Sequence, residues 1–454
     1  MKPTPSQLHL PLSNFDSTEP LEKDQRYVNS NRIDPRDRAF HDWYRFVLSF
    51  PPHLVTNYIE NFGLGRTNVV LDPFCGTGTT LVEAKRHGIR AIGVEANLFA
   101  HFASSVKVDW KVDPNSLKKG AHDIKDSTLE LLKAEGIDDN SPLKGRSKGI
   151  PLRTLDSEAG KLLLTNSISP LPLHKTLVLL ECLKEHQHEP YFRHALLALA
   201  NTLVFRISNL HFGPEVGVGK PKADAPVVAS WMSEVEKIVN DLRLVRNQSF
   251  PNTEVFLGDS RNISRIIQTD SVDAVITSPP YPNEKDYTRT TRLESVVLEF
   301  IKSKAELREM KRNLIRSNTR GVYKGDEDDK WIAGYPEIQR IAESIEKRRK
   351  ELGKSSGFER LYGKVTKLYF GGMARHLADL RSALRPGAKL AYVVGDQASY
   401  LRIMIHTGQL LADIAQALGY ELLRIDLFRT RYATATKAQL REEVIVLRWP
   451  GRER

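Results

Sequence analysis

The sequence contains very little cysteine, because Cys75 and Cys182 are the only two among 454 residues. Two thiols cannot build the disulfide framework of a small secreted protein or a zinc site of four thiolates. An apolar run near the roughly 18 residues that a membrane span needs is also missing, since the richest run, 195–205, contains Asn201 and Thr202. The first residues carry proline and polar groups where a signal peptide has an apolar core. We therefore expect a cytoplasmic protein that is not bound to a membrane.

The charge of the sequence is basic, with 67 Lys and Arg against 56 Asp and Glu, a net charge of +11 and a pI of about 9.4. This excess favours a polyanionic partner, although a basic surface that only keeps the protein soluble is the alternative. The excess is localised: residues 301–364 hold 17 basic and 11 acidic residues, or +6, whereas residues 105–250 hold 20 and 18, or +2. The later segment is the better candidate for contacts with phosphates.

Short apolar runs that end in small or acidic residues recur along the chain. Continuous rather than alternating apolar strands indicate a parallel sheet that is buried on both faces, with helices between the strands. Two further apolar runs near the end, joined by a polar connection, predict an antiparallel pair. The pattern therefore predicts an α/β, doubly wound, mostly parallel seven-stranded sheet. The expected strands are 69–72, 91–95, 255–259, 274–278, 390–396, 422–428 and 443–449.

Two largely helical insertions interrupt this predicted sheet. Helical periodicity is expected at 127–135, 177–186, 193–210, 229–244, 293–315 and 335–352. The resulting division of the chain is an N-terminal arm (1–40), a first part of the sheet domain (41–104), a helical insertion (105–250), a catalytic part (251–300), a basic helical insertion (301–365) and the end of the sheet (366–454).

A glycine-containing loop follows the first expected strand, in the sequence Asp72-Pro-Phe-Cys-Gly-Thr-Gly-Thr-Thr80. Gly76 and Gly78 allow a tight turn and a close approach of the backbone to a ligand. Thr80 and Glu83 have the spacing of a capping box for the next helix. A strand, a glycine loop and a helix start are the arrangement that holds a nucleotide-like cofactor at the carboxyl edge of a sheet. An ordinary tight turn is the alternative, and the loop matches neither the P-loop nor the dinucleotide pattern.

Acidic residues end the next two expected strands. Glu95 is placed to accept hydrogen bonds from both hydroxyls of a ribose, and Asp259 from an adenine amino group. After the fourth strand comes Ser278-Pro279-Pro280-Tyr281, in which two prolines cannot continue the sheet and leave a rigid backbone with free carbonyl groups.

Together, the glycine loop and the Ser-Pro-Pro-Tyr segment resemble the amino-methyltransferases that use S-adenosylmethionine. The segment is the version typical of cytosine-N4-specific DNA methyltransferases, rather than the Asp/Asn-Pro-Pro-Tyr version that is commoner for adenine-N6. The resemblance covers 40–104 and 251–300 well and 366–450 loosely, and it implies a class I methyltransferase-like fold. It implies a catalytic segment at Ser278, Pro279, Pro280 and Tyr281, and a cofactor site at Asp72, Phe74, Cys75, Gly76, Thr77, Gly78, Glu95, Asp259, Phe50 and Pro51.

The expected partner is double-stranded DNA with a flipped target base, and a cognate restriction enzyme is a possible second partner. The basic insertion is the candidate for the DNA-facing element, with the first insertion as the alternative. A solvated helix face is the competing interpretation of its Lys-Arg-Arg-Lys run. The candidate DNA-binding residues are Arg316, Arg320, Lys324, Lys347, Arg348, Arg349 and Lys350.

Three alternatives remain open at this stage. The acceptor could be adenine N6 in DNA or a base in RNA, or the protein could bind DNA without catalysis. Cys75 is expected to be a buried filler and not a nucleophile. Cys182, His186 and His194 do not have convincing zinc spacing, so no metal is expected. The sequence leaves the recognition site and the oligomeric state open.

Overall fold

A seven-stranded sheet forms the centre of the computed structural model, which describes residues 33–46, 49–140, 151–213, 215–283, 285–432 and 439–451. Its strand order is β5-β2-β1-β6-β7-β9-β8, in which the pairs from β5 to β7 are parallel and β9 is antiparallel to both of its neighbours. This arrangement confirms the predicted class I methyltransferase-like sheet. The strands are β1 Val69–Asp72, β2 Arg90–Glu95, β5 Thr253–Leu257, β6 Val272–Thr277, β7 Leu384–Gly395, β8 Glu421–Tyr432 and β9 Gln439–Arg448.

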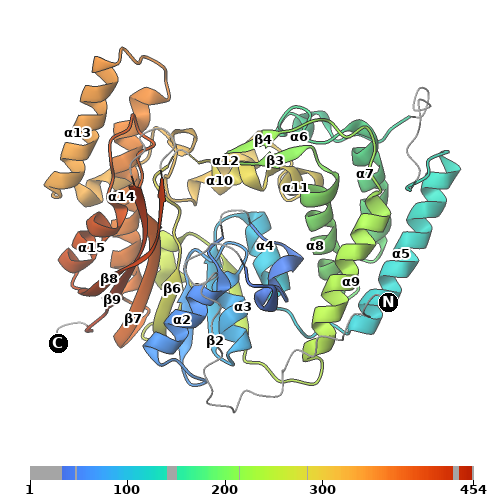
Figure 1. Ribbon diagram of the computed structural model, residues 1–454, viewed down its shortest axis with the longest axis horizontal. Coiled ribbons are helices and arrows are strands. Elements are labelled where there is room, and N and C mark those ends of the chain that lie inside the picture. Colours follow the sequence, from blue (N-terminus) through green and yellow to red (C-terminus); the bar gives the residue numbers. More distant parts are fainter. Residues whose placement is uncertain are drawn as a thin grey trace, which may run out of the picture.

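Alternate residues of the strands pack into two separate cores, one on each face of the sheet. Val70 of β1 belongs to one core, whereas its neighbours Val69 and Leu71 belong to the other. The first face is covered by α2 Pro52–Phe62, α3 Thr79–Arg86 and α4 Leu98–Lys107. The second face is covered by α13 Pro336–Glu351, α14 Tyr362–Leu380 and α15 Thr407–Ala417, which lie to the left of the sheet in Figure 1.

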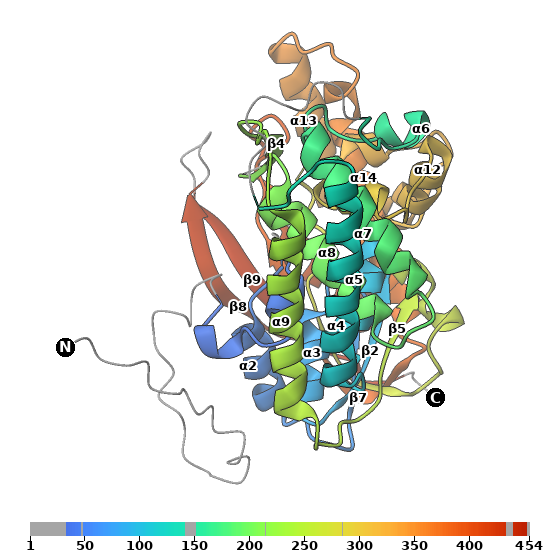
Figure 2. The ribbon, with the colours of Figure 1, turned by 90° about the vertical axis from the view of Figure 1, so that its right-hand side faces the viewer.

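The first insertion packs as a helical block against the first face, on the right in Figure 1 and in front in Figure 2. Its helices are long because apolar residues recur at helical spacing and each face finds a neighbour; Trp231 of α9, for example, is fully buried. A two-stranded hairpin, β3 Leu210–Phe212 with β4 Val216–Val218, interrupts them. The helices are α5 Pro114–Ala134, α6 Ser157–Gly160, α7 Pro170–Glu185, α8 Phe192–Thr202 and α9 Val227–Val245, and a π-helical turn, η3 Leu203–Ile207, extends α8.

The predicted single helix at 293–315 is wrong. The chain forms α11 Arg292–Val297 and α12 Lys304–Arg312 instead, after the short α10 Tyr287–Thr290. Between them Glu299 has a positive φ of 65°, and Ser303 starts α12 by accepting a hydrogen bond from the Glu306 backbone N–H. The chain therefore leaves the helical conformation after Val297, and the N-cap serine begins a separate helix. The other predicted helices are present with shifted ends.

Short 3-10 helices connect several of these elements. They are η1 Pro35–Asp37, η2 His41–Trp43, η4 Ser260–Arg265, η5 Thr319–Gly321, η6 Asp328–Ile332 and η7 Glu359–Leu361. None of the helices that the structure describes is both long and apolar enough to cross a membrane.

The described end of the predicted N-terminal arm (33–40) and the residues directly after it pack into the core. Phe40, Trp43 and Tyr44 are buried, and the Trp43 indole N–H donates to Asp241 of α9 at 2.8 Å. The Tyr44 hydroxyl donates to the carboxyl of Glu294 in α11. This segment therefore connects α9 of the first insertion with α11, which follows the Ser-Pro-Pro-Tyr segment in the chain.

Candidate active site

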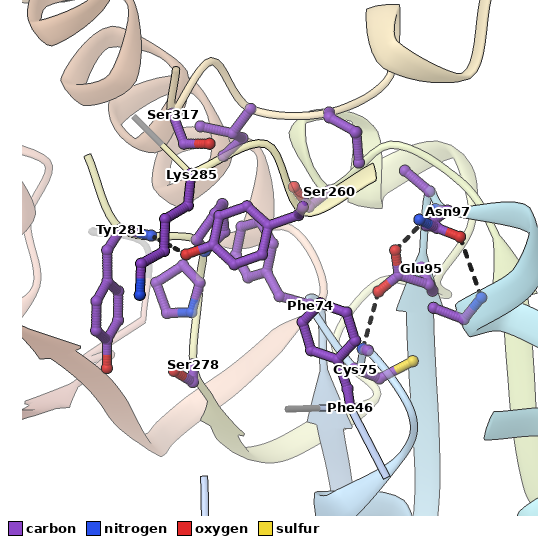
Figure 3. Close-up of a pocket in the computed structure, with 18 of the residues that line it drawn as sticks. Phe46, Phe74, Cys75, Glu95, Asn97, Ser260, Ser278, Tyr281, Lys285 and Ser317 are labelled. Atoms are coloured by element: carbon purple, nitrogen blue, oxygen red, sulfur yellow. Dashed lines mark hydrogen bonds between the residues drawn. The ribbon is translucent and has the colours of Figure 1, made fainter. Parts of the chain in front are cut away.

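A cavity of about 330 Å³ opens at the carboxyl edge of the sheet, where the loops after β1, β2, β5 and β6 converge. In Figure 3, Glu95 and Asn97 lie at one end and Ser278, Tyr281 and Lys285 at the other, with Phe74 between them. The cavity therefore has one end beside β2, where the predicted cofactor residue Glu95 lies, and a second end beside β6 and β7. We call these the β2 end and the β6 end. Of the predicted site residues, it is lined by Phe50, Phe74, Cys75, Gly76, Thr77, Glu95, Ser278, Pro279, Pro280, Tyr281 and Arg316.

The glycine loop is held in one shape by its backbone. Gly76 and Gly78 have φ of 50° and 84°, in the left-handed region that favours glycine. A Cβ at Gly78 would also lie 3.1 Å from the Ser104 Cβ of α4. The predicted capping box is wrong, because Gly78 is the N-cap of α3 without a side-chain bond. Thr80 Oγ1 instead donates to the Ile276 carbonyl of β6 at 3.0 Å, and so joins the two loops.

Asp72 does not line the cavity, although it was predicted in the cofactor site. Its buried carboxylate accepts from the Thr277 hydroxyl at 2.6 Å and from the Phe74 backbone N–H at 3.1 Å. Burial raises the pKa of Asp72 to about 6. Asp72 therefore connects the glycine loop with Thr277, the last residue of β6, which directly precedes Ser278.

Glu95 is held at the end of β2 by two backbone groups. One carboxylate oxygen accepts from the Gly76 N–H at 2.8 Å and the other from the Asn97 N–H at 2.7 Å. Removal from water raises the pKa of Glu95 to about 7, against the opposing effect of these hydrogen bonds. The site thus holds a carboxylate whose remaining lone pairs face the cavity.

Asp259 does not reach the cavity with its carboxylate. Both oxygens bind the Arg261 guanidinium, with the shortest contact at 2.7 Å, and the neighbours Gly258 and Ser260 line the cavity instead. Arg261 is 7% exposed and also pairs with Asp328 of η6 at 2.5 Å. The strand-end carboxylate is therefore used in an internal ion pair, and Asp259 is not among the residues that line the cavity.

Ser278 and Tyr281 occupy the second end of the cavity. The Ser278 hydroxyl donates to the Val393 carbonyl of β7 at 3.1 Å, and the Tyr281 backbone N–H donates to the Tyr287 hydroxyl at 3.1 Å. A Cβ added to Gly395 would lie 3.1 Å from Cε2 of Tyr281, so the ring packs directly on the β7 backbone. Burial raises the pKa of Tyr281, and its ring is therefore a neutral surface.

Phe50 lines the cavity from the segment before α2, whereas Pro51 is the N-cap of that helix. Phe74 stands against the ring of His376 with centroids 4.8 Å apart. The His376 imidazole bridges the Ser260 carbonyl and the Tyr392 hydroxyl, each at 2.7 Å. These contacts hold the Phe74 ring in place at the cavity wall.

The predicted DNA-binding residues have different environments. Arg316 is 4% exposed, and its guanidinium binds Asp326 at 2.8 Å and backbone carbonyls, so it is engaged inside the insertion. Arg320 lies over the Phe358 ring, and Lys324 is exposed. The Lys347–Lys350 run lies on α13, where Arg348 and Arg349 pair with glutamates of the same helix, while Lys347 and Lys350 are exposed.

Several lining residues were not anticipated from the sequence. Asn97 accepts from two N–H groups at the start of α4, and an Asn before an apolar helical run is a recognisable N-cap signal. The others carry no comparable signal, because they meet only through the tertiary fold. Those used in the argument below, or closest to the predicted residues, include Phe46, Lys285, Arg429, Arg431 and Glu442.

The sheet order and a ligand cavity over its carboxyl edge define a class I methyltransferase-like protein. A family model described as DNA methylase matches residues 19–103. Type II methyltransferase M.BsoBI of Geobacillus stearothermophilus is 25% identical over 88% of this chain and 82% of its own. M.AvaI of Nostoc sp. is 22% identical over 87% of this chain and 81% of its own length. M.MjaII of Methanocaldococcus jannaschii is 33% identical, but over only 23% of this chain and 19% of its own length. These matches support the predicted resemblance to the amino-methyltransferases that act on DNA.

Proposed function

We propose that this protein transfers a methyl group from S-adenosylmethionine to the exocyclic N4 amine of cytosine, within a specific sequence of double-stranded DNA. The observation that carries the proposal is the orientation of the Ser278 hydroxyl. Because its proton is donated to the Val393 carbonyl at 3.1 Å, its lone pairs are left to accept a hydrogen from an amine in the cavity. The serine version of the segment is the one that resembles cytosine-N4 enzymes.

The residues at the β2 end fit S-adenosylmethionine. The Glu95 carboxylate keeps lone pairs for two ribose hydroxyls beyond the two backbone N–H groups that it accepts. The position of a Cβ on Gly76 is open for at least 4 Å, which leaves room for the methionine part beside the loop. When bound, S-adenosylmethionine supplies an electrophilic methyl group on a sulfonium sulfur.

The residues at the β6 end suit an amine acceptor. The lone pair of a cytosine amine is delocalised into the ring, so the nitrogen becomes nucleophilic only when its hydrogens are held out of the ring plane. Ser278 Oγ and the Pro279 carbonyl are the two acceptors for those hydrogens, and the Tyr281 ring offers a face for stacking the base. As the new nitrogen–carbon bond forms and the sulfur–carbon bond breaks, one amine proton leaves to solvent. Alignment of this kind supplies about 7–11 kcal/mol of a barrier in favourable cases.

The target base has to leave the duplex to reach Ser278, which costs a few kcal/mol that stacking in the cavity offsets. We place the DNA backbone along the basic insertion, with Arg320, Lys324 and the cations of α13 as contacts. Relatives that are named type II methyltransferases support a role in restriction and modification, with a cognate restriction enzyme or alone. Such a protein acts in the cytoplasm.

The test is the chemical identity of the methylated base. The gene is expressed in a bacterial host that lacks DNA methyltransferases, and its DNA is digested to nucleosides for mass spectrometry. We expect N4-methyldeoxycytidine, at one sequence context on methylation-sensitive sequencing, and none from a Ser278→Ala control. N6-methyldeoxyadenosine instead would contradict the acceptor, and the absence of any methylated base would contradict the function.

A further inference from the structure

Three cationic side chains surround the β6 end of the cavity, and the proposed function above gives none of them a role. Lys285 follows the Ser-Pro-Pro-Tyr segment, and Arg429 and Arg431 are alternate residues of β8 that face the same side. Glu442 of β9 contacts both arginines, at 2.6 Å from Arg429 Nε and 3.4 Å from Arg431 Nε. All four residues line the cavity that contains Ser278.

The way Glu442 binds the arginines leaves their outer groups available. Both contacts use the Nε atoms, and the described part of the chain gives the terminal nitrogens of neither guanidinium a hydrogen-bond partner. Arg429 and Arg431 are 27% and 39% exposed, whereas Glu442 is 11% exposed. A buried carboxylate thus contacts two guanidinium groups through their Nε atoms and leaves their terminal donors for a ligand or solvent.

The charge at this end of the cavity is not balanced. One carboxylate, Glu442, faces two arginines and Lys285, which leaves an excess of two positive charges, and no carboxylate among the described residues pairs with the Lys285 ammonium. The other cations of the cavity wall are neutralised, since Lys311 pairs with Asp286 at 2.7 Å and Arg316 with Asp326 at 2.8 Å. Burial and the nearby charge of Arg431 lower the pKa of Lys285, against the opposing effect of Glu442.

The position of the cluster identifies the kind of anion. Glu442 pairs with Gly395 in the β7–β9 register, and a Cβ on Gly395 would touch both Tyr281 and Glu442. The arginines therefore lie beyond the Tyr281 ring, on the side of the sheet away from β2 and Glu95. In Figure 2 the β8–β9 hairpin that carries them extends outward from the sheet. An anion that is attached to a base stacked at Tyr281 would meet them, whereas the ribose end of a cofactor would not.

We propose that Arg429 and Arg431, aligned by Glu442, act with Lys285 to bind the phosphodiester group of the nucleotide whose base is presented to Ser278. This inference rests on the proposed function, because it takes the acceptor to be a nucleotide in DNA. Guanidinium groups present forked donors that match phosphate oxygens, and an ammonium adds a point charge. By holding the phosphate, the cluster positions the sugar so that the base reaches the amine acceptors. Glu442 is a positioning residue in this arrangement.

The test compares an Arg429→Gln/Arg431→Gln double variant with the wild type and with Arg424→Gln. Arg424 is a matched control, because it lies on the same strand, pairs with Asp426 at 3.0 Å and does not line the cavity. Affinities are measured for S-adenosylmethionine and for a duplex that contains the sequence methylated by the wild type, over a range of salt concentrations. We expect the Kd for this duplex to rise at least tenfold and the salt slope of log affinity to fall by about 0.9, the value of one phosphate. The cofactor affinity and the control variant should not change.

A second duplex makes the assignment specific. It carries an uncharged methylphosphonate in place of the phosphate at the target nucleotide, so the wild type should lose affinity for it and the double variant should not distinguish the two duplexes. Loss of cofactor affinity, with or without loss of DNA affinity, would overturn the inference, because the arginines would then serve the cofactor or the cavity as a whole. Unchanged DNA binding would also overturn it. A wild type that methylates no DNA would instead contradict the proposed function.

Discussion

Replacing Glu95 by Gln removes the only carboxylate that the structure directs into the described part of the β2 end of the cavity. The change keeps the size of the side chain and an acceptor oxygen, but it removes the charge. A hydrogen bond to a charged group contributes about 1.5–3 kcal/mol, so the Kd for S-adenosylmethionine should rise about 10- to 150-fold at pH 8. Isothermal titration of the purified protein measures this constant directly.

The same residue predicts a pH dependence. Because the pKa of Glu95 is raised to about 7, the free protein binds a proton there as the pH falls through 7. Binding of ribose hydroxyls needs the ionised form, so the affinity should be complete well above pH 7 and should fall about tenfold for each pH unit below it. Between pH 8.5 and 6.5 the affinity should therefore fall about fourfold, while Asp72, with a pKa of about 6, stays mostly ionised. The Gln variant should show no slope. Equal constants for the two proteins at pH 8, or equal slopes, would refute the assignment of the ribose to Glu95.

Three further predictions concern packing, stability and DNA. Gly395→Ala should lower kcat at least tenfold with an unchanged cofactor Kd, because its Cβ would lie 3.1 Å from Tyr281 and 3.3 Å from Glu442; a normal kcat would show that the ring need not be held there. Burial raises the pKa of Glu294 in the folded protein to about 8, whereas its ordinary value in the unfolded chain is 4.5. As the pH rises from about 4.5 to 8, the unfolded chain loses this proton and the folded protein keeps it, so the free energy of unfolding falls. Glu294→Gln should therefore flatten the decline of Tm between pH 6 and 8.5, and parallel curves would contradict this. Joint neutralisation of Lys347–Lys350 should weaken DNA binding and lower the slope of log affinity against log salt by about 0.9 for each lost phosphate contact. The control, Lys118→Gln with Lys119→Gln in the first insertion, should change neither quantity. The reverse result would place DNA on the first insertion.

The sheet was predictable because its strands are continuous apolar runs and their ends carry the glycine loop, Glu95 and the Ser-Pro-Pro-Tyr segment. The carboxyl ends of parallel strands meet at one edge, so these residues were expected to converge, and the cavity brings them together. The break at Glu299 was missed because apolar spacing continues across it, although Ser303 is an N-cap residue that begins a new helix.

Residues whose partners are distant in the sequence could not be predicted in the same way. Asp259 was misplaced because a strand-end carboxylate and an arginine two residues later form their own pair, which then joins Asp328 from the other insertion. Arg316 was expected to face DNA, yet Asp326 and backbone carbonyls bind it inside the insertion. The positions of Arg429 and Arg431 at the β6 end of the cavity depend on the β7–β9 and β8–β9 registers, which no local pattern specifies.

The most direct measurement of the central claim is single-turnover methyl transfer by Ser278→Ala, with enzyme in excess over a duplex that the wild type methylates. The substitution removes one of the two acceptors for the amine hydrogens and leaves the Pro279 carbonyl, Glu95 and the glycine loop unchanged. The account predicts that the variant binds S-adenosylmethionine as the wild type does and transfers its methyl group at least 100-fold more slowly, at an effect of about 3 kcal/mol. A wild-type transfer rate in this variant would contradict the account.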